Sequence, residues 1–174
     1  MGPTLRTVAH EAGHAVAVYL HGGDISWVSA LPDDRQGGHV AWRHDDGCSS
    51  CEPIAAAIIA LAGPLTSAAY VGERGNLPAG DGTDLDQFDH AVGEMAHSPL
   101  ESAALAAWLH VRARAFVRTP RFRALATHLV KLLTAHGELA GDTVTAELER
   151  ASALFDQIYR GGSAAVWESI KPMQ

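Results

Sequence analysis

The residues best suited to chemistry lie close to the start of the chain, in the run His10-Glu11-Ala12-Gly13-His14. This run fits the His-Glu-x-x-His pattern, in which two imidazoles four residues apart share one face of a helix and can bind the same Zn²⁺ ion. In such a site the ion activates a water molecule and polarises a carbonyl, while the glutamate takes up the proton. The sequence therefore predicts His10 and His14 as metal ligands and Glu11 as the catalytic base of a hydrolase.

A catalytic zinc ion needs a third protein ligand and an open fourth position. The residues alone leave several acidic candidates open, all of them after the long apolar run in the middle of the chain: Glu73, Asp81, Asp84 and Asp86. Thr83 has the character of a helix N-cap, which would place Asp84 in the first turn of a helix. The Asp84 carboxylate could equally serve there as a favourable charge at the helix N-terminus, with no metal involved.

The metal-binding pattern needs a helix to hold it, and the apolar spacing predicts one from about Thr4 to His21, ended by Gly22-Gly23. Glycine in the interior of a helix costs about 1 kcal/mol relative to alanine. The presence of Gly13 close to Ala12 and Ala15 therefore indicates that another element packs closely over this helix.

Further along, residues 25–31 and 38–42 have the composition of two strands in a small sheet. An apolar run opening at Pro53 predicts a buried helix to about Gly72, which Gly63-Pro64 could kink or split. After a Gly- and Asp-rich loop the pattern is helical from Thr83 to about Tyr159, with breaks expected near Pro99, Pro120, Gly137 and Gly141. We expect a mainly α domain with a small β-element over residues 1–160, followed by a C-terminal tail over residues 161–174.

Bulk properties narrow the function classes. The 174 residues suit one domain, and a net charge of -7 would repel a phosphate backbone, so nucleic acid is not an expected partner. The longest uninterrupted apolar stretch, residues 54–64, falls short of the ~20 residues that cross a bilayer, so no membrane span is expected. The start of the chain lacks the pattern of a secretory leader, and we expect a cytoplasmic location.

Several segments, in order, resemble the peptidase domain of the FtsH family of ATP-dependent zinc metalloproteases. They are His10-Glu11-Ala12-Gly13-His14-Ala15-Val16, Leu61 to Ala69, Thr83-Asp84-Leu85-Asp86-Gln87, and His128 to Val144. The resemblance implies Asp84 as the third zinc ligand, a mainly helical fold of FtsH-peptidase type, and a strand near residues 38–42 as the edge that receives an extended peptide. The family's Gly-x-x-x-x-Gly-Lys-Thr loop and membrane anchor do not occur in this sequence, so the resemblance is to a stand-alone peptidase domain.

These observations favour a zinc-dependent endopeptidase that cuts peptides or unfolded protein segments. Two other functions stay open: a zinc hydrolase such as an amidase or tailoring peptidase with one dedicated substrate, and a non-catalytic peptide-binding regulatory module. The intact Glu11 favours an enzyme, because a pure binding module does not need a base. A homo-oligomer and a separate ATPase or adaptor partner are also left open.

Three further groups have more than one interpretation. A second, structural zinc site, a disulfide and plain loop residues are all open for the group His39, His44, Cys48 and Cys51. A basic cluster is interpreted as a solvated face or an oligomer contact, with an anion or acidic-partner site as the alternative: Arg112, Arg114, Arg118, Arg121 and Arg123. Trp27 and Trp42 are expected to pack within the strands, with a substrate groove as the alternative.

Overall fold

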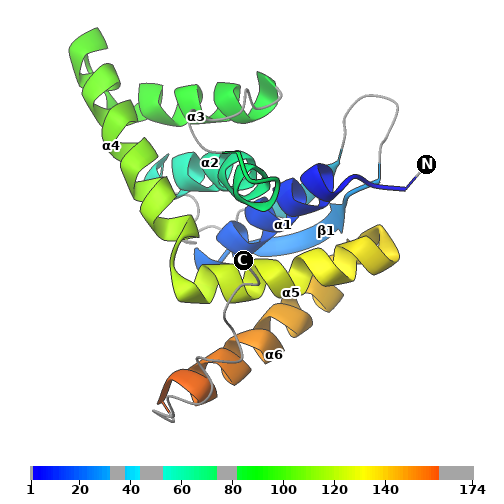
Figure 1. Cartoon of the computed structure of the whole chain (residues 1–174). Helices are drawn as coiled ribbons and strands as arrows, with labels where there is room; N and C mark the ends of the chain where they lie inside the picture. The colour runs from blue at the N-terminus through cyan, green and yellow to red at the C-terminus, as the bar shows by residue number, and fades with distance from the viewer. Residues whose placement is uncertain (1, 32–37, 44–52, 74–81, 161–174) are drawn as a thin grey trace.

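The computed structural model describes residues 2–31, 38–43, 53–73 and 82–160, and it is mainly helical with one small antiparallel sheet (Figure 1). The fold class expected from the sequence is confirmed at this level. In chain order the elements are α1 (Leu5–Leu20), β1 (Asp24–Ser29), β2 (His39–Arg43), α2 (Pro53–Tyr70), α3 (Gly82–Met95), α4 (Pro99–Val117), α5 (Pro120–His136), β3 (Glu138–Ala140) and α6 (Gly141–Arg160).

Helix α1 lies at the centre of the fold. It begins where predicted, because the Thr4 side chain accepts a hydrogen bond from the backbone N–H of Thr7 at 3.1 Å and caps the first turn. Helix α2 packs across it at very short range: a methyl group added at Gly13 would lie 2.6 Å from the Ala62 carbonyl oxygen. The close approach predicted from Gly13 is therefore confirmed, and α2 is the element that makes it.

Helix α2 runs as one element from Pro53 to Tyr70 with Pro64 inside it, so the split considered at Gly63-Pro64 does not occur. Proline removes a single backbone donor, and the turns on either side are held by burial among α1, α3 and α4. By length and composition α2 could cross a membrane, but 67% of it is buried inside the fold, as in the core helix of many proteins.

The sheet has the order β2-β1-β3, with β1 in the middle and antiparallel to both neighbours. The two predicted strands are confirmed, with bounds that differ by one or two residues. Strand β3 was not predicted; its three residues form a strand because Leu139 pairs with Val28 of β1, more than a hundred positions earlier in the chain. Strand β1 packs against both α1 and α6, while α5 packs directly against α1 (Figure 1).

The later helices begin and end at the predicted breaks. Ser98 and Thr119 cap α4 and α5, each followed by proline, and Gly137 ends α5 with a φ of 78°. The expected N-cap role of Thr83 is wrong, because α3 already begins at Gly82 and Thr83 lies inside its first turn. Asp84 nevertheless lies in that first turn, as predicted.

Some predictions fall on parts of the chain outside the described residues. These are Asp81, His44, the cysteine pair Cys48 and Cys51, and the tail over residues 161–174.

The described core has two clusters, one joining α1 to α2, α5, α6 and β1, and a second joining α2 to α3 and α4.

Candidate metal centre

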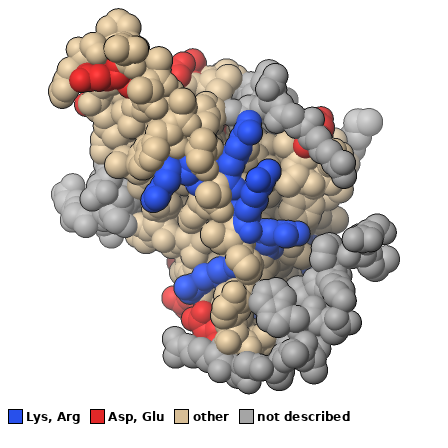
Figure 2. Space-filling model, turned by 60° about the vertical axis from the view of Figure 1, so that its left-hand side comes forward, with Lys and Arg blue, Asp and Glu red and all other residues tan. Residues whose placement is uncertain are grey.

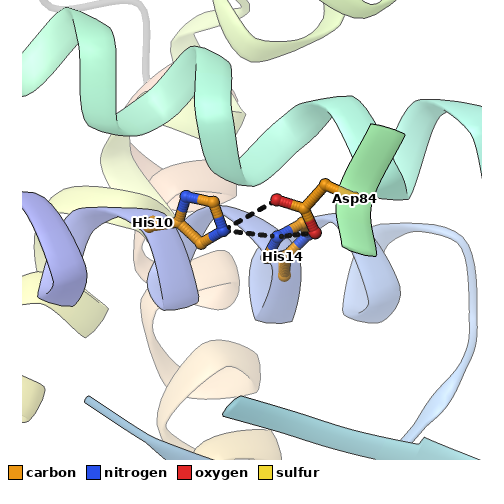
Figure 3. A group of neighbouring side chains, drawn as sticks. All are labelled: His10, His14 and Asp84. Atoms are coloured by element: carbon orange, nitrogen blue, oxygen red, sulfur yellow. Dashed lines mark hydrogen bonds and ion pairs between the residues drawn. The ribbon is translucent and has the colours of Figure 1, made fainter. Parts of the chain in front are cut away.

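Three side chains from two helices converge on one point inside the fold (Figure 3). Helix α1 contributes His10 and His14, and the first turn of α3 contributes Asp84. The Nε2 atoms of the two imidazoles are 3.0 Å apart. The Asp84 carboxylate reaches both of them, with Oδ2 2.9 Å from His10 Nε2 and Oδ1 3.2 Å from His14 Nε2. Among the three acidic candidates that the structure describes, Glu73, Asp84 and Asp86, it is Asp84 that reaches the histidines.

The spacing of these atoms fits a tetrahedral ion. Ligand atoms held at roughly 2.0–2.1 Å from such an ion lie about 3.3 Å from one another. The observed separations of 2.9, 3.0 and 3.2 Å are slightly shorter, so the side chains would move apart by a few tenths of an ångström on binding. Within the described part of the chain, this trio is the one group with metal-ligand spacing.

A backbone contact fixes the orientation of His14. Its Nδ1 lies 2.8 Å from the carbonyl oxygen of Ile59 in α2. A carbonyl can only accept, so Nδ1 carries the proton, and in the neutral ring the Nε2 atom presents a lone pair to the cluster. This is the arrangement in which a second hydrogen bond sets the tautomer of a metal-binding histidine.

The electrostatics of the cluster favour a positive charge between the three groups. Burial by itself would lower the pKa of His14, but the Asp84 carboxylate and the nearby Glu11 outweigh it and raise that pKa. Burial would likewise raise the pKa of Asp84, yet the two imidazoles hold it well below its usual range. Asp84 Oδ2 is buried and lacks an aligned hydrogen-bond donor in the described structure. A proton or a metal ion would satisfy these groups.

The opposite helix leaves room for the His14 ring only because residue 63 has no side chain. A methyl group added at Gly63 would lie 2.2 Å from His14 Nε2 and 2.5 Å from its Cδ2. These distances are far below contact, so any larger residue would displace the ring. Gly63 thus keeps open the position that His14 Nε2 occupies.

Glu11 lines the same space from the neighbouring position on α1. Its side chain is buried and lies against Gly38, the residue just before β2, where an added methyl group would be 2.6 Å from Oε1. The space is an open cavity of about 180 Å³ between α1, α2, α3 and β2. Its lining comprises His10, Glu11, His14, Gly38, His39, Val40, Trp42, Ile59, Thr83, Asp84 and Gln87.

The remaining predicted residues lie elsewhere. Glu73 pairs with Arg6 at the surface, and Asp86 is exposed on α3. His39 and Trp42 face the cavity from β2, whereas Trp27 lies outside its lining.

Sequence reasoning missed three contributors to the site. The Ile59 carbonyl gives no signal in the sequence, because every residue has one. Gly63 and Gly38 could have been suspected as points of close approach, since glycine in a helix or beside a strand often marks one.

No known protein family matches this chain, and no curated protein matches it either.

Proposed function

We propose that this chain is a zinc-dependent metallopeptidase that hydrolyses peptide bonds in peptides or unfolded protein segments. The observation that carries the proposal is the convergence of His10, His14 and Asp84 in a cavity that also holds the Glu11 carboxylate. Two imidazoles and one carboxylate form a three-ligand set that leaves a fourth position open.

Zinc bound there would lower the pKa of a water molecule to about 7 and polarise the substrate carbonyl. The residues supply the rest of the chemistry. Glu11 Oε1 lines the cavity next to the ligands and can accept the proton of the attacking water, then deliver it to the leaving amine. Asp84 balances the charge of the site, and the Ile59 carbonyl keeps His14 Nε2 directed at the metal position.

The walls of the cavity support an extended peptide as the substrate class. Strand β2 is at the edge of the sheet, and His39, Val40 and Trp42 from it line the cavity. A peptide aligned with such an edge gains main-chain hydrogen bonds while its carbonyl reaches the metal position. The ordered resemblance to FtsH-type peptidase domains, with Asp84 as third ligand, supports the same assignment.

The same donor set also serves iron(II) in oxygenases. The base beside the ligands favours zinc and hydrolysis, since Glu11 has a direct use in activating water and none in binding dioxygen. Metal analysis separates the two assignments.

The test measures metal content and cleavage of unfolded casein by wild type and matched variants. Wild type should hold about one zinc per chain, and His14→Ala and Asp84→Ala should lose it together with cleavage. Glu11→Gln should keep zinc while cleavage falls by roughly 10²–10⁴. The exposed residues His90 and Asp86 provide controls, since His90→Ala and Asp86→Ala should change neither reading.

Each failure has its own meaning. Wild type without zinc would refute the proposal. Bound zinc without casein cleavage would point to the dedicated-substrate hydrolase. A regulatory binding module is indicated if wild type shows no turnover and Glu11→Gln binds peptide as well as wild type does.

A further inference from the structure

Helix α4 carries apolar side chains on two opposite faces. Its inner face packs against α2 and α3 through Leu109 and Ala113, both completely buried. Its outer face presents Leu100, Trp108 and Val111 to solvent, with exposed fractions of 82%, 45% and 67%. Neighbouring apolar side chains that stay exposed on a helix mark a surface that a partner can cover.

The outer face forms one continuous stripe along α4, which we call the α4 stripe. Its members recur at the spacing of a helical face and are all exposed: Leu100, Ala104, Ala107, Trp108, Val111, Ala115 and Arg118. Figure 1 shows α4 along the left edge of the molecule, outside α2 and α3. No residue of α4 lines the candidate metal centre, so the stripe has no part in the proposed reaction.

The α4 stripe is complementary in shape to an inverted copy of itself. In an antiparallel pairing centred between Ala107 and Trp108, Leu100 lies opposite Ala115, and Val111 lies opposite Ala104. Each large exposed side chain then meets a small one, which lets two helices approach closely.

Charge favours the same antiparallel arrangement. Glu101 lies in the first turn of α4, and its carboxylate accepts a hydrogen bond from the backbone N–H of His97 at 2.8 Å. In this pairing His97 of one copy lies opposite Arg118 of the other. The Glu101 carboxylate, which is bonded to the His97 N–H, is therefore close to the Arg118 guanidinium of the other copy. A parallel pairing would place like charges together.

Both basic and acidic side chains lie on the face that carries α4 (Figure 2). Figure 2 brings the α4 side forward and shows basic side chains across the middle of this face, with acidic side chains nearer its margins. Arg112 adds to the basic half of α4, with its guanidinium 5.4 Å from the centre of the Trp108 ring.

We propose that the α4 stripe is a self-association surface, on which a second copy of this chain packs its own α4 antiparallel about a two-fold axis near Ala107 and Trp108. Such an interface is isologous, because each contact occurs twice. A single helix pair is small for a stable interface, so the dimer dissociates on dilution. The metal cavity remains open in it.

The first experiment is sedimentation velocity on the full chain over a roughly hundredfold range of concentration. Wild type should shift from monomer to dimer as concentration rises. Ala104→Glu should remain monomeric, since it places a charge opposite Val111. Ala135→Glu changes an exposed alanine near the end of α5 and should dimerise as wild type does. A wild type that stays monomeric, or an Ala104→Glu variant that still dimerises, overturns the proposal; circular dichroism confirms that both variants are folded.

The second experiment tests the antiparallel orientation. Glu101→Arg and Arg118→Glu should each raise the dissociation constant of the dimer about tenfold, because each places like charges opposite one another. The double variant restores opposite charges and should recover most of the affinity. Failure of the double variant to recover overturns the antiparallel pairing, and recovery supports it.

Discussion

Helices α1 and α4 are both rich in alanine, yet they depart from the usual pattern of burial in opposite ways. Helix α1 places polar groups inside the fold, where Glu11 and His14 are 6% and 9% exposed. Helix α4 places apolar groups outside it, as Leu100 and Val111 show. Polar residues are usually exposed and large apolar residues usually buried. Exceptions mark positions where the residue is explained by a functional role and not by the stability of the fold. In α1 that place is a cavity on which His10, His14 and Asp84 converge, and in α4 it is the exposed stripe that we propose as a self-association surface.

The largest expected effect comes from closing the space that α2 leaves for α1. Gly63→Ala puts a methyl group 2.2 Å from His14 Nε2, so the ring must leave the cluster and metal affinity should fall by more than about 100-fold. Zinc analysis after dialysis measures this. Gly93→Ala is the matched control, because the space around Gly93 in α3 is open and the variant should keep its metal. Full zinc occupancy in Gly63→Ala would contradict the geometry of the site.

A matched pair of valines tests the contrast between the helices directly. Val16 in α1 is completely buried, so Val16→Ala should lower the free energy of unfolding by about 2 kcal/mol through lost burial and the cavity left behind. Val111 in α4 is 67% exposed, so Val111→Ala should change it by less than about 0.5 kcal/mol. Urea unfolding in dilute solution measures both. Equal losses of unfolding free energy in the two variants would contradict the burial of Val16 and the exposure of Val111.

A smaller effect is expected where Glu11 meets Gly38, the residue just before β2. Gly38→Ala places a methyl group 2.6 Å from Glu11 Oε1, and the flexible carboxylate should move aside. Casein cleavage should then fall about tenfold while zinc content stays at the wild-type level, because no ligand is touched. Loss of zinc in this variant would show that the disturbance reaches beyond the base.

The smallest effect concerns His110 on the inner side of α4, whose ring lies 4.8 Å from that of Phe88. Burial and the nearby Arg114 lower the pKa of His110, with a smaller opposing influence from Asp89. The unfolded chain therefore takes up a proton first as the pH falls through about 6.5, and stability decreases over that range. Unfolding curves for wild type and His110→Gln should converge as the pH falls. An NMR titration that places the pKa of His110 above its ordinary value would reverse the sign.

Local signals in the sequence predicted most of the helices. Ser98-Pro99 and Thr119-Pro120 each combine a capping side chain with a proline at the first helical position, and these starts depend on neighbours alone. Strand β3 could not be found in this way. It is too short for a periodic pattern, and its pairing with β1 depends on residues far away in the chain.

In the candidate site, too, the residues set by local spacing were predicted and those set by distant contacts were not. His10, Glu11 and His14 were predicted because a helix fixes their mutual spacing. The residues alone left Asp84 among four candidates, because the packing of α3 against α2 decides which carboxylate reaches α1. The roles of Gly63 and Gly38 depend on contacts across the fold, which no local pattern encodes.

The hydrogen bond from His14 to the Ile59 carbonyl has a consequence for mutational robustness. Because the acceptor belongs to the backbone, replacing the Ile59 side chain leaves the acceptor atom in place, and the orientation of His14 is insulated from sequence drift at that position. The contact depends instead on the path of α2. Changes that redirect this helix, such as those at Gly63 or Pro64, would therefore alter the imidazole without touching either partner of the bond.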